Sequence, residues 1–173
     1  GGFNQPMFRM LKRVIPFLNG RSLAAEWIDT IDGPKTDLFF ATELGCGVLS
    51  TAKKEWQWKL EGGMSLNTAT LGQIDEQAVA LIGGMDGFVA AVDLSDGQVI
   101  RRHHSGAPVI GISQLKSGSL IVTTQTEIQS LDQHWEHRHT LSRQVKRVLT
   151  VSDDRLLVCL HDDTLELIEL TSS

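Results

Sequence analysis

Three histidines lie close together in the last third of the chain, at His134, His137 and His139. Imidazole is a common ligand of transition metals, so this cluster first suggests a metal site. On a β-strand, however, successive side chains point to opposite faces, which separates His134 from the other two. No cysteine or carboxylate is spaced to complete a four-ligand site. We therefore predict no metal site and interpret the histidines as part of a solvated edge strand.

Two adjacent pairs of carboxylates, Asp153–Asp154 and Asp162–Asp163, have the residue type that general acid–base catalysis uses. Both pairs lie where hairpin turns are expected, and aspartate favours turns because its carboxylate bonds to nearby backbone. Neither pair has the spacing of an EF-hand calcium loop. We therefore interpret both as turn residues and assign them no catalytic role.

No nucleophile or phosphate-binding pattern accompanies these carboxylates. The glycines within Gly83–Gly87 match neither the dinucleotide nor the P-loop fingerprint, and no serine or cysteine lies in a nucleophile elbow. The two cysteines, Cys46 and Cys159, are too few for a disulfide framework, and we expect free thiols. We predict that the protein is not an enzyme and has no cofactor.

The elements that must position these residues repeat with a period of about 40 residues. Segment 162–170 recurs in altered form at 86–94, more weakly at 125–133 and most faintly at 45–53. The matched apolar positions are spaced 41, 39 and 37 residues apart, at Val48, Val89, Ile128 and Leu165. A period of this length is typical of repeat architectures, so the fold must be built from similar units.

Each unit is predicted to form short strands separated by turn residues. The second unit shows this most clearly, with strands at 66–74, 78–82, 88–94 and 98–103 and glycine-containing turns between the later ones. The second strand is apolar throughout, whereas the fourth is polar, as expected for an outer edge. We predict an all-β, propeller-like fold of about four blades of four antiparallel strands. The expected repeat domain is 23–173, with units at about 23–63, 64–106, 107–143 and 144–173.

The third strand of the units resembles that of WD repeats, whose pattern runs Asp-Gly-x-Val-x-x-Trp-Asp-Leu. The matching residues in the second unit are Asp86, Gly87, Val89, Asp93 and Leu94. An aliphatic residue takes the tryptophan place in the second, third and fourth units. The resemblance implies a rigid platform for protein partners rather than a reaction.

The second unit also resembles a quinoprotein-type propeller repeat, which reads Ala-x-Asp-x-x-x-Gly-x-x-x-Trp. Ala91, Asp93 and Gly97 match, but Arg101 stands in the place of the docking tryptophan. The first unit has two tryptophans near that place, Trp56 and Trp58. This resemblance implies an alternative function, a redox or small-ligand-binding domain. Quinone-dependent members of that family use adjacent cysteines and a calcium site, whereas the two cysteines here lie far apart in the sequence.

The last unit ends before its fourth strand, which leaves the propeller incomplete. Propellers have about four to eight blades, so three completions stay open. A strand from Arg9 to Ile15 could complete the last unit, a second chain could complete the ring, or the chain could belong to a longer polypeptide. An incomplete propeller exposes apolar blade faces, which mark association surfaces. We therefore expect a protein partner or self-association.

The first 22 residues form a separate basic segment with four basic and no acidic side chains. The rest of the chain holds 12 basic against 21 acidic residues, so we predict no nucleic-acid binding. Apolar residues within 6–18 have helical spacing, but the stretch is short and Pro16 would end a helix there. We favour a closing strand or short helix packed on the ring over a membrane-binding segment.

These observations together predict a non-catalytic protein-interaction scaffold. No run of about 18 apolar residues and no secretory signal pattern is present, so we expect a cytoplasmic protein. Partners are expected to dock on loops that join strands or on exposed blade edges. The candidate interaction residues lie in three such turns and are Asp86, Gly87, Lys116, Asp153 and Asp154.

Overall fold

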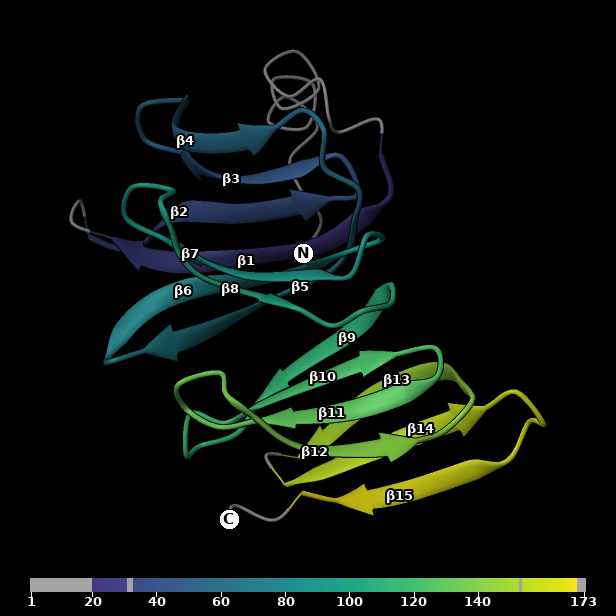
Figure 1. Ribbon diagram of the computed structural model, residues 1–173. Helices are drawn as coiled ribbons and strands as arrows, with labels where there is room; N and C mark the ends of the chain where they lie inside the picture. Colours follow the sequence, from purple (N-terminus) through teal and green to yellow (C-terminus); the bar gives the residue numbers. More distant parts are fainter. Residues whose placement is uncertain (1–19, 31–32, 153, 171–173) are drawn as a thin grey trace. The chain divides into compact units, whose positions relative to one another are not determined.

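The computed structural model describes residues 20–30, 33–152 and 154–170. The described residues form β-strands and turns without a helix, and the strands make four antiparallel sheets (Figure 1). The prediction of an all-β fold built from four sheets is therefore confirmed. The proposed closing strand at 9–15, the basic face of segment 6–18 and Asp153 lie outside the described residues.

Each sheet is a simple meander in which strands adjacent in sequence pair with one another. The first sheet contains β1 (Ser22–Thr30), β2 (Gly33–Thr42), β3 (Gly45–Ser50) and β4 (Glu55–Glu61). The second contains β5 (Leu66–Ile74), β6 (Gln77–Gly84), β7 (Phe88–Asp93) and β8 (Val99–His104). The third contains β9 (Val109–Gln114), β10 (Leu120–Thr124), β11 (Glu127–Leu131) and β12 (His137–Ser142). The fourth has three strands, β13 (Val145–Ser152), β14 (Arg155–Leu160) and β15 (Leu165–Glu169).

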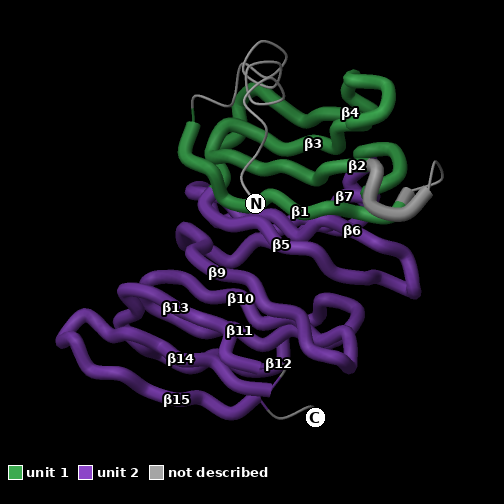
Figure 2. The backbone as a smooth tube through the Cα atoms, turned by 180° about the vertical axis from the view of Figure 1, so that it is seen from behind, with its two compact units in different colours: residues 1–66, 94–97 green, residues 67–93, 98–173 purple. Residues whose placement is uncertain are grey.

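The chain divides into two compact units (Figure 2). Unit 1 holds the first sheet and also the turn 94–97, which follows β7. Unit 2 holds residues 67–93 and 98–173, and therefore the second, third and fourth sheets.

The core of unit 1 lies on the central strands of its sheet. Every residue of β3 is buried, and Leu38 and Phe39 of β2 are at most 2% exposed. The outer strand β4 contributes Trp58, whose indole Nε1 donates a hydrogen bond of 2.7 Å to the carbonyl oxygen of Leu94. Gly97 lies against the same indole ring with a φ of +76°, and a Cβ there would be 2.8 Å from a ring carbon. Trp58 thus holds the turn 94–97 within unit 1.

The core of unit 2 consists of two layers of side chains, one between each pair of successive sheets. Val79, Leu81, Val89 and Ala91 of the second sheet cluster with Val109, Leu120 and Val122 of the third. Ile121 and Ile128 on the other face of the third sheet cluster with Val145, Leu156 and Val158 of the fourth. Strand β10 contributes to both layers because its successive side chains alternate between faces. Its wholly apolar start is therefore explained by burial on both sides.

We predict that Gly97→Ala destabilises the protein more than Gly62→Ala. Both glycines have a positive φ, so each substitution costs roughly 1–2 kcal/mol of backbone strain. A Cβ at Gly62 meets no atom within 4 Å, whereas one at Gly97 collides with Trp58 and costs about 1–3 kcal/mol more. Urea unfolding followed by tryptophan fluorescence measures both. Equal losses in the free energy of unfolding would contradict the assigned contact between Trp58 and the turn.

Candidate protein interface

Two of the predicted interaction residues, Asp86 and Gly87, lie in the turn between β6 and β7. The Asp86 carboxylate accepts a 3.2 Å hydrogen bond from the backbone N–H of Phe88. Gly87 has a φ of +92°, and its carbonyl accepts bonds of 2.8 Å from both the backbone N–H and the hydroxyl of Ser105. These contacts explain both residues as turn formers.

The other described candidates lie at the opposite end of their sheets. Lys116 is exposed in the turn between β9 and β10, and Asp154 is exposed in the turn between β13 and β14. Asp154 accepts a 2.7 Å bond from the Ser152 hydroxyl. Antiparallel strands reverse direction at each turn, so the first and second turns of a sheet lie at opposite ends. The structure therefore does not bring Asp86 and Gly87 together with Lys116 and Asp154.

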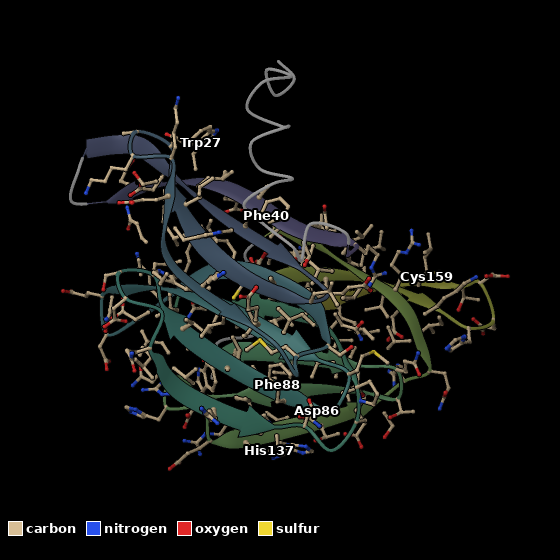
Figure 3. The ribbon with its side chains drawn as sticks, turned by 90° about the horizontal axis from the view of Figure 1, so that it is seen from above. Trp27, Phe40, Asp86, Phe88, His137 and Cys159 are labelled. Atoms are coloured by element: carbon tan, nitrogen blue, oxygen red, sulfur yellow. The ribbon has the colours of Figure 1, made fainter. Side chains whose placement is uncertain are left out.

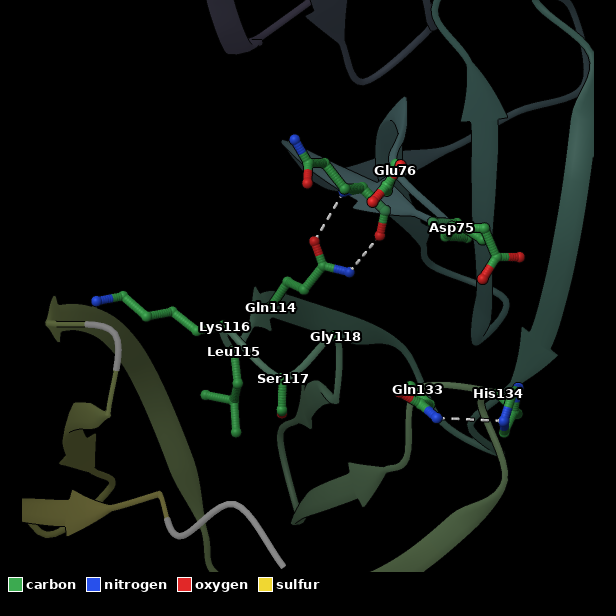
Figure 4. Close-up of a pocket in the computed structure, with 11 residues that line it drawn as sticks. Asp75, Glu76, Gln114, Leu115, Lys116, Ser117, Gly118, Gln133 and His134 are labelled. Carbon is green, nitrogen blue, oxygen red and sulfur yellow. Dashed lines mark hydrogen bonds between the residues drawn. The ribbon is translucent and has the colours of Figure 1, made fainter.

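Lys116 lines a polar cleft of about 530 Å³ within unit 2 (Figure 4). The Gln114 side chain spans from the third sheet to the second. Its Oε1 accepts a bond of 2.8 Å from the backbone N–H of Gln73, and its Nε2 donates one of 2.7 Å to the Gln73 carbonyl. Gln133 and His134 close another side. Within the described part of the chain, no group of three histidine, cysteine or carboxylate residues could hold a metal ion.

The turn between β11 and β12, beside the cleft, is organised by Asp132. Its carboxylate accepts hydrogen bonds of 2.8 Å and 3.0 Å from the backbone N–H groups of His134 and Glu136, and one from the Arg138 guanidinium. Desolvation acts to raise the pKa of this carboxyl, but the backbone bonds and Arg138 outweigh it and lower the pKa. The arrangement fixes the turn rather than preparing an acid or base.

Arg101 takes over the contact that Trp58 makes in unit 1. Trp58 donates to the carbonyl of the residue after the repeat aspartate Asp93, and Arg101 Nη1 donates at 2.9 Å to the carbonyl of Gln133, which follows Asp132. The Arg101 guanidinium carbon also lies 5.7 Å from the ring centroid of Trp135, within cation–π range. The arginine in the tryptophan place of the quinoprotein-type motif therefore still connects the second sheet to the third.

The fourth sheet presents an apolar surface to solvent, here called the open face. Register places Leu149, Leu157 and Leu167 side by side across three strands, and Cys159 between the exposed Arg147 and Leu165. Exposure is 57% for Leu149, 66% for Leu165 and 54% for Leu167, while Cys159 (Figure 3) is half-buried. The open face consists of Leu149, Val151, Leu157, Cys159, Leu165 and Leu167.

The repeat shows that the open face occupies positions that are core elsewhere. Leu165 and Leu167 are the counterparts, 76 residues later, of Val89 and Ala91, which are both 0% exposed. In the second sheet these positions are covered by the third sheet. Sequence reasoning predicted a missing strand in the last unit and exposed apolar blade faces, but it did not identify which residues form this face, although the repeat alignment held the signal.

The comparisons with solved structures show the fold. The crystal structure of the WD40 β-propeller domain of Doa1 is matched with a TM-score of 0.66 at 13% identity, covering 84% of this chain and 50% of that one. The crystal structure of the computationally designed Ika4 protein is matched with a TM-score of 0.66 at 11% identity, covering 88% and 94%. No family model and no curated protein sequence matches the chain.

These likenesses establish a β-propeller fold, and the four sheets match a partial propeller. The predicted propeller-repeat character is thereby confirmed, while identities this low carry no statement about activity. The chain spans half the length of the Doa1 domain structure that it matches. Within the described ranges, no helix is long and apolar enough to cross a membrane.

We predict that Glu76→Gly stabilises the protein, whereas Glu76→Ala does not. Asp75 and Glu76 form the two-residue turn between β5 and β6 with φ values of +49° and +67°, the type I′ geometry that favours Asn-Gly. Glycine removes roughly 1 kcal/mol of strain at Glu76 and returns roughly 0.5 kcal/mol as unfolded-chain entropy. Chemical denaturation should show a gain of about 0.5 kcal/mol in the free energy of unfolding for glycine alone. A loss with glycine would contradict the turn assignment.

We predict that the protein loses stability as pH falls from about 7 to about 5 and that His103→Gln reduces this loss. Burial lowers the pKa of His103, Gln129 opposes this shift, and the charges of His137 and His104 add to the lowering. The Nε2 atom of His103 is also buried, and within the described part of the chain it has no hydrogen-bond partner.

The sign follows from the lowered pKa. Above the ordinary histidine pKa of about 6.5 the imidazole is neutral in both the folded and the unfolded chain. Its contribution to the free energy of unfolding is therefore fully present there. Below that pH the unfolded chain takes up the proton more readily, so the free energy of unfolding falls. Thermal melts across this pH range measure the effect. They are recorded for the wild type, His103→Gln and the exposed control His161→Gln. A control variant that flattens the profile as much as His103→Gln would contradict the assignment.

Proposed function

We propose that the protein is a non-catalytic interaction scaffold that binds partner proteins through the open face of the fourth sheet. One observation carries the proposal: Leu165 and Leu167 are more than half exposed, whereas their repeat counterparts Val89 and Ala91 are fully buried. Contiguous exposed apolar surface of this kind is typical of association sites.

The surroundings of the open face support a protein partner. Arg155 and Glu169 pair at 3.7 Å across β14 and β15, next to the exposed leucines. Lys146 and Asp163 pair at 3.2 Å at another margin. An apolar centre with charged residues around it is the usual composition of a protein–protein interface. The chemistry that fits is an apolar sheet or an extended apolar segment of another protein.

The quinoprotein-like alternative is not supported by the residues that would have to serve it. Cys46 and Cys159 are both free, and burial raises the pKa of the Cys46 thiol to about 12, which disfavours a reactive thiolate. The described residues also contain no cluster of three or more histidine, cysteine or carboxylate side chains that could hold a metal ion. The hydrogen bond from Trp58 to the Leu94 carbonyl supports a similarity to quinoprotein-type repeats in how the blade is built. It does not support a redox or ligand-binding function.

Substitution of the open face tests the proposal. Three immobilised proteins are compared: the wild type, the double variant Leu165→Ser/Leu167→Ser and the control Leu44→Ser/Met85→Ser. Mass spectrometry quantifies the proteins that each of them retains. The control positions are also exposed apolar residues, at 43% and 49%, but lie in turns outside the open face. We expect retention of specific partners to fall roughly tenfold to hundredfold in the open-face variant alone.

Two readouts make the result decisive. Melting temperatures of both variants should stay close to that of the wild type, because the substituted side chains are exposed. If every protein is retained equally by the wild type and the open-face variant, the open face is not an interface and the proposal fails.

A further inference from the structure

We propose that an extended acidic segment of another protein binds the outer edge of the second sheet as an added strand. Strand β8 forms this edge, and its four consecutive basic side chains, here called the basic edge, are Arg101, Arg102, His103 and His104. The basic edge lies within unit 2, on a different sheet from the open face.

Strand β8 has one side that no other described strand pairs with. It is the outermost strand of its sheet, and in the described part of the chain its strand partner is β7. Such an edge presents backbone N–H and C=O groups to which another extended chain can bond. Successive side chains alternate, so the half-buried Arg101 and His103 lie on the face toward the third sheet, and the exposed Arg102 and His104 lie on the other. Basic side chains therefore flank the edge on both faces.

The sign of its charge distinguishes this edge from two other outer strands. Charge of either sign protects an edge from unwanted pairing. Strand β4 carries both signs, with Glu55 and with Lys59 paired to Glu61 at 2.9 Å. On β12 the Arg138 guanidinium is bonded to the Asp132 carboxylate. Among the described residues, no carboxylate pairs with either arginine of the basic edge, so their charge is available to an anionic partner.

Contacts within unit 2 hold two donors of the basic edge in place. Arg101 Nη1 donates at 2.9 Å to the Gln133 carbonyl, and its guanidinium stacks on Trp135. A guanidinium has five N–H groups, so others can serve a carboxylate. His104 Nδ1 accepts a 3.2 Å bond from the backbone N–H of Gly106, which places the proton of the neutral ring on Nε2 and makes that atom a donor. Side chains that are already fixed lose little entropy when a partner binds.

The chemistry of this edge selects an acidic polypeptide. Backbone donors and acceptors alternate along a strand, so another strand satisfies both, whereas the phosphodiester backbone of a nucleic acid offers acceptors only. A second β8 would bring basic side chains opposite basic side chains, which destabilises a strand pair, whereas carboxylates opposite them stabilise it. Because both faces are basic, the partner segment carries acidic residues at consecutive positions rather than at alternate ones.

Fluorescence anisotropy with two labelled peptides tests this pattern. Both are about eight residues long and contain the same numbers of glutamates and threonines. In one peptide the glutamates are consecutive, and in the other they alternate with threonine. The consecutive peptide meets basic side chains on both faces of β8, whereas the alternating peptide meets them on one. We expect the consecutive peptide to bind roughly threefold to tenfold more tightly.

Substitutions locate the binding surface. Arg102→Glu should weaken binding of the consecutive peptide roughly tenfold or more, because repulsion replaces attraction at an exposed position. Lys59→Glu makes the same change of charge on the outer strand β4 and should leave binding unchanged, as should Leu165→Ser/Leu167→Ser on the open face. Thermal melts establish that each variant is folded. A loss with Lys59→Glu equal to that with Arg102→Glu overturns the assignment to β8.

Amide hydrogen exchange separates strand addition from contact through side chains alone. An added strand bonds to the backbone of β8, so the consecutive peptide should slow exchange within Val99–His104 and leave exchange within Glu55–Glu61 unchanged. Binding without this protection overturns the added strand.

The remaining outcomes concern the identity of the partner. No binding of the consecutive peptide at about 1 mM, or equal binding of the two peptides, overturns the acidic segment. A labelled single-stranded oligothymidylate of the same length that binds as tightly as the consecutive peptide overturns the choice of a polypeptide. None of these results bears on the open face, which its own variants test.

Discussion

Central strands that are apolar on both faces impose the constraint on which the rest of this structure depends. Adjacent residues such as Leu81 and Ile82 of β6 are both 0% exposed, so neither face of that strand meets water. A single sheet cannot bury both of its faces, because its strands contact one another only along their edges. Such strands require cover on both faces, and within unit 2 the second and fourth sheets provide it for the third.

Polar side chains connect the sheets at the margins of these apolar layers. The Gln114 amide bonds twice to Gln73, and the hydroxyls of Ser113 and Thr150 lie 2.8 Å apart between the third and fourth sheets. Arg101 adds a charged contact in the same region. These bonds are directional, so they select one register of sheet against sheet, whereas the apolar layers supply most of the stabilisation.

The sequence was sufficient to predict the strands, because apolar runs such as Leu120–Val122 and turns such as Ser95–Gly97 are local signals. The repeat period was sufficient to predict four similar sheets. Long-range features were not predictable in the same way. Asp86 and Lys116 looked equivalent as turn residues, but they lie at opposite ends of their sheets because antiparallel strands alternate in direction. The role of Leu167 depended on whether a neighbouring sheet covers it, which no local pattern encodes.

Strand β15 has a further property that follows from its edge position. An uncovered edge with leucines at alternate positions is a template on which identical strands stack into cross-β fibrils. Here Glu166 lies on the opposite face from the leucines and Glu169 lies on the same face as them. Arg143 bonds to Glu166 at 2.9 Å and 3.2 Å. Stacked copies of β15 would place like charges at every layer of such a fibril. One five-residue strand thus combines exposed leucines with carboxylates whose charges oppose the stacking of identical strands.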